Sequence, residues 1–287
     1  MAMMMRHMRK QCKRYTLYLN YCEYFDSALP SICCKLHAIS FKKNMKTDLL
    51  AFGVHPDDVE LGCAGVLLSE KKSGKKTVII DLTQGELGTR GTAETRKEEA
   101  ADAAKILGVN ARENLMMADG FFENNEINQR KIITVLRKYQ PEIIFCNAPE
   151  DRHPDHGRSA SLVEDAAFLA GLSKIETFYD NELQKAWRPK YVFNFIQDRY
   201  LKPDFVVDIS DTMEQKIQSI KAYKTQFFNT DAQGGPQTYI STPEFLDSVV
   251  ARAAMFGKMI GVKYAEGFLS KKMIGLKSID ALVQQTT

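Results

Sequence analysis

The chain has 287 residues, of which 44% are hydrophobic and 26% charged, so it can form a large α/β domain with a buried core. Its net charge is +3, and residues 45–287 hold 31 basic and 34 acidic side chains. A mildly acidic body argues against a nucleic-acid partner, which would favour a basic surface. No apolar run approaches the ~20 residues that a membrane-spanning helix needs, so no membrane partner is expected.

Residues 1–44 differ from the rest of the chain. They contain four of the six cysteines and eight basic against two acidic residues, and they show neither a helical nor a strand period. We interpret them as a poorly ordered extension that comes from an upstream start assignment, with the natural start at Met45, and we expect them to be dispensable. Residues 45–287 are expected to form a single domain, whose two cysteines, Cys63 and Cys146, are buried thiols in a reducing cytoplasm.

Short apolar runs alternate with amphipathic segments along the main body, which predicts strands alternating with helices. Strands are expected at residues 49–54, 77–82, 115–118, 143–146, 191–196 and 205–209. Helices are expected at residues 59–72, from a cap at Thr92 to one at Gly108, and at residues 127–139, 211–227 and 242–258. Asp211 and Glu214 predict a capping box at the start of the fourth helix.

This alternation predicts an α/β fold with a Rossmann-like, mostly parallel β-sheet flanked by helices. Ligands of such sheets bind outside the carboxyl ends of the strands, so the active site is expected there. No G-x-G-x-x-G pattern follows the first strand. A dinucleotide cofactor is therefore not expected.

Two short motifs lie where predicted strands end: His-Pro-Asp-Asp, which begins at His55, and His-Pro-Asp-His, which begins at His153. If the first turn opens a helix, His55 and Asp58 lie three residues apart on one side of it and offer two metal ligands. A third ligand can come from the second motif, where both His153 and His156 are available. Three protein ligands and one open position are typical of catalytic zinc, which lowers the pKa of its bound water to about 7.

The other polar side chains of these motifs suit proton transfer. Asp57 is a candidate general base for a bound water. The histidine of the second motif that does not bind the metal is a candidate for stabilising an oxyanion or protonating a leaving amine, with Asp155 to orient it. Two histidines and one carboxylate also suit iron(II), so the ligand types do not choose between Zn²⁺ and Fe²⁺.

The two motifs resemble those of the LmbE-like, PIG-L-type deacetylases, which are zinc enzymes that remove acetyl groups from N-acetylglucosamine derivatives. The resemblance implies that the zinc ligands are His55, Asp58 and His156. It implies that the catalytic residues are Asp57 as general base and His153, with Asp155 beside it, as the group that stabilises the transition state. It also implies that Arg96 and Asp119 bind the sugar.

Two further segments, residues 81–92 and 261–268, are similar to the branch of this family that acts in bacillithiol biosynthesis on N-acetylglucosaminyl-malate. The first segment adds Glu86 and Arg90 as candidate substrate-binding residues. Members of the family often form trimers or hexamers, so the resemblance implies a homo-oligomer whose other partner is a small N-acetylglucosaminide.

Two kinds of alternative stay open. An amidase that cleaves bacillithiol S-conjugates, or a deacetylase of another N-acetylglucosamine derivative, would use the same chemistry. A metal-bearing sugar-binding protein without turnover is the non-enzymatic alternative. The presence of Asp57, His153 and Asp155 argues against it, because binding alone needs no base.

Overall fold

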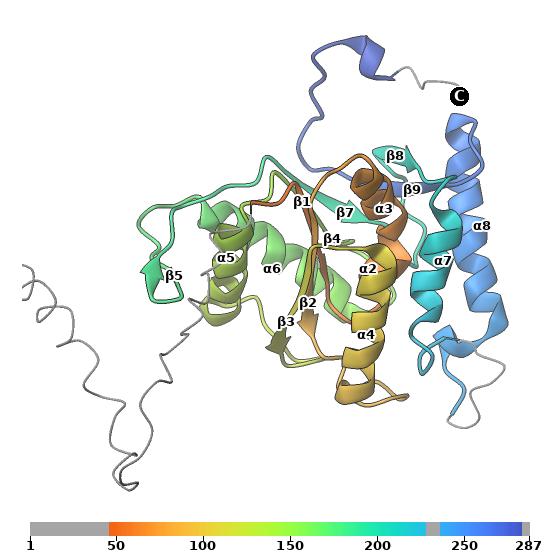
Figure 1. Cartoon of the computed structure of the whole chain (residues 1–287), viewed down its shortest axis with the longest axis horizontal. Coiled ribbons are helices and arrows are strands. Elements are labelled where there is room, and N and C mark those ends of the chain that lie inside the picture. Colours follow the sequence, from red (N-terminus) through yellow and green to blue (C-terminus); the bar gives the residue numbers. More distant parts are fainter. Residues whose placement is uncertain (1–45, 228–235, 283–287) are drawn as a thin grey trace, which may run out of the picture. The chain divides into compact units, whose positions relative to one another are not determined.

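The computed structural model describes residues 46–227 and 236–282 (Figure 1), which belong to a compact unit that spans Lys43–Thr287. The extension expected at residues 1–44 lies outside the described residues. None of the helices that the structure describes combines the length and the apolar character that a membrane span requires.

A seven-stranded sheet forms the centre of this unit, in the order β3-β2-β1-β4-β7-β9-β8. Its strands are β1 (Leu49–Gly53), β2 (Thr77–Thr83), β3 (Ala111–Met117), β4 (Ile143–Asn147), β7 (Tyr191–Phe195), β8 (Phe205–Asp208) and β9 (Ala265–Leu269). The first five strands of the order are parallel, and β9 is antiparallel to both of its neighbours. A separate two-stranded ribbon contains β5 (Phe178–Tyr179) and β6 (Glu182–Leu183). The predicted Rossmann-like, mostly parallel sheet is confirmed.

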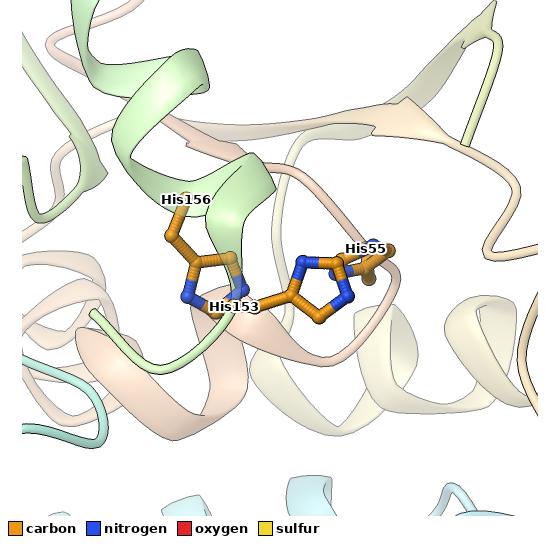
Figure 2. Close-up of side chains that lie close together, drawn as sticks. All are labelled: His55, His153 and His156. Atoms are coloured by element: carbon orange, nitrogen blue, oxygen red, sulfur yellow. The ribbon is translucent and has the colours of Figure 1, made fainter. Parts of the chain in front are cut away.

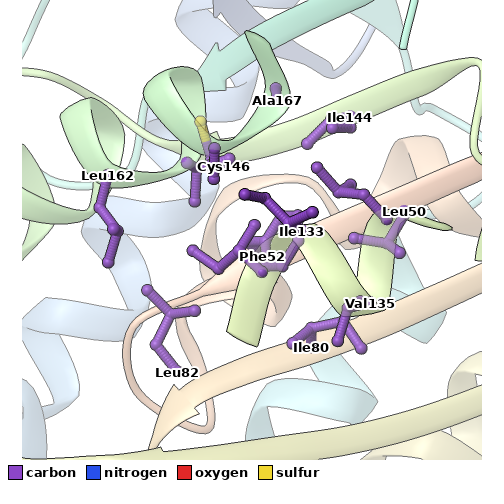
Figure 3. Packing of buried hydrophobic residues seen from close by; sticks show 14 of the residues in the cluster. Leu50, Phe52, Ile80, Leu82, Ile133, Val135, Ile144, Cys146, Leu162 and Ala167 are labelled. Atoms are coloured by element: carbon purple, nitrogen blue, oxygen red, sulfur yellow. The ribbon is translucent and has the colours of Figure 1, made fainter. Parts of the chain in front are cut away.

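Helices cover both faces of the sheet (Figure 1). They are α2 (Asp58–Gly62), α3 (Ala64–Lys72), α4 (Ala93–Leu107), α5 (Glu126–Tyr139), α6 (Pro154–Ala170), α7 (Met213–Lys221) and α8 (Pro243–Ile260), with 3-10 turns η2 (Tyr239–Ser241) and η3 (Ile279–Leu282). Successive side chains of a strand point to opposite faces. Leu50 and Phe52 of β1 therefore pack with α5 and α6 (Figure 3), while Leu49 and Ala51 pack with α2 and α3 on the other face.

The helix predicted at residues 59–72 is in fact two helices, α2 and α3, which meet at Cys63. The cause is a carboxylate from the far end of the chain. Glu266 of β9 accepts hydrogen bonds from the backbone N–H groups of Gly65 and Val66, at 2.9 and 2.8 Å. It thereby caps α3 as a separate helix, because these N–H groups belong to its first turn and need an acceptor there. The short helix α2, which begins at Asp58, is therefore separate from α3 and carries the end of the first motif.

Other differences concern element ends. The helix predicted at residues 211–227 ends at Lys221, and its N-cap residue is Thr212 without a side-chain cap hydrogen bond, so the predicted capping box is wrong. The strand predicted at residues 115–118 is longer, because β3 pairs with β2 from Ala111 onward. The prediction did not include α6 or β9, although Pro154 at the first turn of α6 is a typical start signal.

Candidate active site

The carboxyl ends of four neighbouring strands meet at one edge of the sheet. Strands β3, β2, β1 and β4 are adjacent and parallel, so the segments that follow them emerge side by side. Those segments carry His55 after β1, Glu86 after β2, Asp119 after β3 and His153 after β4. The parallel topology thus gathers residues that are far apart in the sequence, at the edge where ligands of such folds bind.

A cavity of about 320 Å³ opens at this edge. Eight of the ten side chains predicted from the sequence line it: His55, Asp57, Asp58, Arg90, Arg96, Asp119, His153 and His156. The other two, Glu86 and Asp155, are not among the lining residues. Most of the predicted site residues therefore line the cavity, and two of them lie behind its wall.

The three histidines of the two motifs converge (Figure 2). Their ring centroids are 4.7 to 5.8 Å apart, and one nitrogen of each ring lies within 4.8 Å of the other two. Asp58 reaches the same place, because its Oδ1 lies 3.3 Å from His156 Nε2 and its Oδ2 lies 3.7 Å from His55 Nδ1. The structure thus brings together the predicted ligand set, with His153 beside it.

Each of the two histidines that face Asp58 has a carboxylate at its other ring nitrogen. Asp151 Oδ2 lies 2.7 Å from His156 Nδ1, and Asp119 Oδ1 lies 2.9 Å from His55 Nε2. In metal sites such a carboxylate fixes the orientation and tautomer of the imidazole. A neutral ring that donates from the outer nitrogen presents its lone pair on the inner one. His156 Nε2 and His55 Nδ1 are therefore placed to bind a cation beside Asp58.

Asp58 is held by three hydrogen-bond donors. Its Oδ1 accepts from Gln197 Nε2 at 2.8 Å, and its Oδ2 accepts from Asn147 Nδ2 at 3.1 Å and from the backbone N–H of His55 at 2.9 Å. Burial acts to raise the pKa of this carboxyl, but His156 and His55 override burial and hold the pKa well below its ordinary value. Asp58 is thus an ionised, oriented carboxylate, which is the form that a metal ligand requires.

The electrostatics around His156 favour positive charge. Burial acts to lower its pKa, but Asp58 and Asp151 outweigh this effect and raise the pKa to about 10. A divalent cation can take the place of the proton, since metal binding releases protons from its ligands. The donors are two imidazoles and the carboxylate of Asp58, and a further carboxylate lies behind each imidazole. This set fits a divalent metal ion in both charge and donor type.

Asp57 is strained and lies next to this cluster. It precedes α2 with φ 135°, a conformation that costs a residue other than glycine about 1–3 kcal/mol and that is common at active sites. Arg96 Nη2 donates to Asp57 Oδ2 at 2.9 Å and to the carbonyl of Pro56 at 2.7 Å. Burial raises the pKa of Asp57 to about 7, and Arg96 opposes the rise. A carboxyl group with a pKa near neutrality is suited to general base catalysis.

His153 is the N-cap residue of α6, and its Nδ1 accepts from the backbone N–H of Asp155 at 3.3 Å. Burial and the neighbouring histidines lower its pKa. The expected pairing of the Asp155 carboxylate with His153 does not occur among the described hydrogen bonds. Instead, Asp155 Oδ2 accepts from the backbone N–H of Gly120 at 2.8 Å, and Oδ1 accepts from Arg158 Nη1 at 2.6 Å. Both oxygens of this carboxylate are thus occupied by other donors.

The loop after β2 holds the two remaining candidates. Glu86 accepts from the backbone N–H groups of Gln84 and Asp119, at 3.1 and 2.9 Å, so it joins two loops rather than facing the cavity. Arg90 lines the cavity, but its Nε donates to the carbonyl of Thr225 at 2.7 Å. The structure places both side chains in loop-to-loop contacts.

Several side chains at the site were not predicted from the sequence: Asn147, Asp151, Arg152, Gln197, Asp198 and Tyr239. The rule that ligands bind where parallel strands end could have pointed to Gln197, which lies two residues after β7. No local pattern marks Tyr239, because it lies in the isolated 3-10 turn η2.

Fold and site together define an α/β enzyme with a histidine–carboxylate centre suited to a divalent metal. A family model described as PIG-L, GlcNAc-PI de-N-acetylase, matches residues 50–167, a range that contains both motifs. The diacetylchitobiose deacetylase of Thermococcus kodakarensis is 30% identical over 254 residues, which cover 85% of this chain and 90% of that protein. The chain therefore belongs to the PIG-L family of deacetylases, and it is a hydrolase of amide bonds.

Two other comparisons refine this placement. The crystal structure of the conserved protein TT1542 from Thermus thermophilus superposes with a TM-score of 0.71 at 34% identity, covering 80% of this chain and 98% of that one. A probable N-acetyl-α-D-glucosaminyl L-malate deacetylase 2 of Bacillus subtilis is 26% identical over 199 residues, or 63% of this chain and 84% of that protein. The identity to this probable malate-conjugate deacetylase is thus lower than the identity to the diacetylchitobiose deacetylase.

Proposed function

We propose that this protein is a zinc-dependent N-deacetylase that hydrolyses the acetamide group of an N-acetylglucosaminide. The observation that carries the proposal is the convergence of His55, Asp58 and His156 in a cavity whose wall also holds Asp57 and His153. The names of the Thermococcus and Bacillus relatives support this choice, because both describe deacetylases of N-acetylated sugars.

His55, Asp58 and His156 would hold the metal ion. When bound, Zn²⁺ supplies a water of lowered pKa, about 7, and polarises a carbonyl oxygen. We propose zinc rather than Fe²⁺ because the family resemblance implies it, while the donor set suits either ion. The contacts of Asp119 with His55 and of Asp151 with His156 support this assignment, since they present the correct ring nitrogens.

Asp57 is the proposed general base. It accepts a proton from the attacking water, the water oxygen bonds to the acetyl carbonyl carbon, and the carbon–nitrogen bond then breaks. His153 stabilises the negative charge on the carbonyl oxygen, and the proton passes to the leaving amine. The products are acetate and a free amino sugar. Arg96 keeps Asp57 in place, while Arg96, Asp119 and Arg90 are the proposed sugar contacts because all three line the cavity.

N-acetylglucosaminyl-malate is the proposed substrate. Arg152 at the cavity supports a substrate with an anionic aglycone: its side chain is 45% exposed, its Nε lies 3.6 Å from Asp198, and it lies over the ring of Tyr239 at 4.6 Å. A loosely paired guanidinium of this kind suits a carboxylate of malate. Diacetylchitobiose has no carboxylate and is the competing substrate, and an amidase of bacillithiol S-conjugates would use the same cavity chemistry.

The test is acetate release from N-acetylglucosaminyl-malate, diacetylchitobiose and N-acetylglucosamine, with and without a chelator. We expect chelator-sensitive release that is fastest with the malate conjugate. Release of cysteinyl products from bacillithiol S-conjugates in place of acetate would favour the amidase. Binding of these sugars without any turnover by the metal-loaded protein would support the non-enzymatic alternative.

We also propose that residues 45–287 form a single deacetylase domain and that the protein works in the cytoplasm as a homo-oligomer, a trimer or hexamer as the resemblance implies. The buried free thiols of Cys63 and Cys146 support a reducing compartment. Deleting residues 1–44 should leave acetate release and solubility unchanged, and light scattering would give the oligomeric state. Loss of activity on this deletion would contradict the single-domain proposal.

A further inference from the structure

Asp155 is a buried carboxylate that the deacetylation chemistry does not explain. Its side chain is fully buried at the start of α6, outside the lining of the cavity, and its carboxylate is not hydrogen-bonded to His153 among the described residues. A buried carboxylate is costly unless its oxygens have partners, so its position calls for a role. Its hydrogen-bond partners are Gly120 and Arg158, and its Oδ2 also lies 4.0 Å from His55 Nε2.

These partners close a ring around the main-chain N–H and C=O of one residue, Gly120. Asp155 Oδ2 accepts from the N–H of Gly120 at 2.8 Å, while Arg158 Nη1 donates to the carbonyl of Gly120 at 3.0 Å and to Asp155 Oδ1 at 2.6 Å. Asp155 and Arg158 are three residues apart on α6, so both project from the same side of its first turns. Phe122 supports the guanidinium, whose carbon lies 5.3 Å from the ring centroid.

Gly120 belongs to the Asp119 turn, residues 118–121, which follows β3. The turn is closed by a hydrogen bond from the N–H of Phe121 to the carbonyl of Ala118, and Gly120 has φ +72°, which favours glycine. On its other side the turn is tied to the loop after β2. Asp119 Oδ2 accepts from the N–H of Leu87 at 3.0 Å. The turn is therefore fixed between α6 and the loop after β2.

We propose that Asp155 and Arg158 form one positioning pair, which holds the Asp119 turn and thereby sets the Asp119 carboxylate against the His55 imidazole. Asp119 Oδ1 lies 2.9 Å from His55 Nε2, and this contact turns His55 Nδ1 toward Asp58. The pair thus links the second motif to the proposed metal ligand of the first. The inference rests on the proposed metal site, and neither member of the pair needs to touch metal or substrate.

The experiment measures Zn²⁺ affinity by competition with a chromophoric chelator, together with kcat and KM for the best substrate. Partners behind metal ligands are typically worth 10-fold to 100-fold in affinity or activity. We expect Arg158→Met to weaken Zn²⁺ binding about tenfold and to lower kcat with little change in KM. Arg158→Lys, which keeps a donor to Asp155, should recover part of the loss. The matched control is Arg130→Met, because Arg130 pairs with Glu126 on the exposed face of α5.

A double-mutant cycle with Asp119→Asn decides whether the pair acts through Asp119. If it does, Arg158→Met adds little to the loss in Zn²⁺ affinity already caused by Asp119→Asn. Additive losses, or an Arg158→Met protein that binds Zn²⁺ like the control, would overturn the proposal. If Arg158→Met does not fold, the same cycle is run with Arg158→Lys. A protein that binds Zn²⁺ without turnover refutes the proposed function alone, because the affinity arm needs no substrate.

Discussion

The two histidine-bearing corners of the site are built in different ways. The first corner, residues 53–58, is a tight turn between β1 and α2 with Asp57 at φ 135°, and the partner of its histidine, Asp119, follows another strand. The second corner, residues 151–158, opens the long helix α6 with a proline in its first turn. There the partner of His156 is Asp151, only five residues earlier.

The histidine of the first corner is oriented by a distant segment, whereas the histidine of the second is oriented by its own segment. The first corner depends on the loops after β2 and β3, on Arg96 of α4 and on the cap that Glu266 provides to α3. In the second, His156 is oriented by Asp151 of the same segment, which also accepts from Arg199 N, although Asp155 and Arg158 contact Gly120 of the Asp119 turn. Changes elsewhere in the chain should therefore disturb the first corner more than the second.

The largest expected effect comes from Asp57→Asn. Removing a general base typically costs 10²-fold to 10⁴-fold in rate, and the amide cannot accept the proton. We expect kcat to fall within that range while Zn²⁺ affinity stays close to that of the unchanged protein, because Asp57 is not among the proposed ligands. His156→Ala is the contrast, with loss of the metal as well as the activity. Near-normal turnover by Asp57→Asn would exclude it as the base.

The second prediction compares the two carboxylates behind the histidines. Asp119→Asn and Asp151→Asn should each lower Zn²⁺ affinity by about 10-fold to 100-fold, because each removes the charge that orients a ligand. Asp119→Asn should also raise KM for the sugar, since Asp119 lines the cavity. Chelator competition and steady-state kinetics give both quantities. Equal KM effects in the two variants would contradict a sugar contact for Asp119.

In the metal-free protein the two corners should respond to different pH ranges. The folded-state pKa of Asp57 is raised from 3.8 to about 7, so the folded state holds this proton more tightly and stability falls as the pH rises through that range. The pKa of His156 is raised from 6.5 to about 10, so its contribution is lost between those values. Urea unfolding from pH 4 to 10 measures both slopes. Asp57→Asn should flatten the lower range, and His156→Gln the upper; unchanged slopes would refute the assignment.

The smallest effect is expected at the rim of the cavity. Arg152→Gln should raise KM for N-acetylglucosaminyl-malate by about fivefold, the size of one exposed charge pair of roughly 1 kcal/mol. Diacetylchitobiose, which lacks a carboxylate, should show little change. Because the side chain of Arg152 contacts Asp198 and Tyr239 rather than the proposed metal ligands, Zn²⁺ affinity serves as the internal control. Equal changes in KM for both substrates would argue against an anion contact.

Much of the fold followed from local sequence signals. The caps of α4 are present as predicted, with Thr92 accepting from the N–H of Thr95 and Gly108 in the left-handed conformation. The alternation of apolar runs also gave the parallel sheet, because buried strands and amphipathic helices have distinct periods. What failed was the division of α2 from α3, since the carboxylate that causes it lies at Glu266, about 200 residues away in the chain.

The site shows the same difference between features set by local sequence and features set by distant contacts. Motif spacing was sufficient to bring His55 and Asp58 together with the histidines of the second motif, because two strand ends on one sheet edge must meet. The choice of His156 over His153 came from the family resemblance. The direction in which Asp155 points could not be predicted, because it depends on where Gly120 and Arg158 lie in space. The partners of Asp58 were missed for the same reason.

The position of Glu266 also affects when α3 can become fully hydrogen-bonded during synthesis of the chain. The N-terminus of α3 next to the first corner is capped by a residue of β9, and Lys216 of α7 contacts the same carboxylate at 2.5 Å. A nascent chain therefore makes α3 early but can complete its cap only when residue 266 has left the ribosome. Until then the first turn of α3 lacks this acceptor, so the N-terminus of α3 is among the last parts of the domain to become fixed.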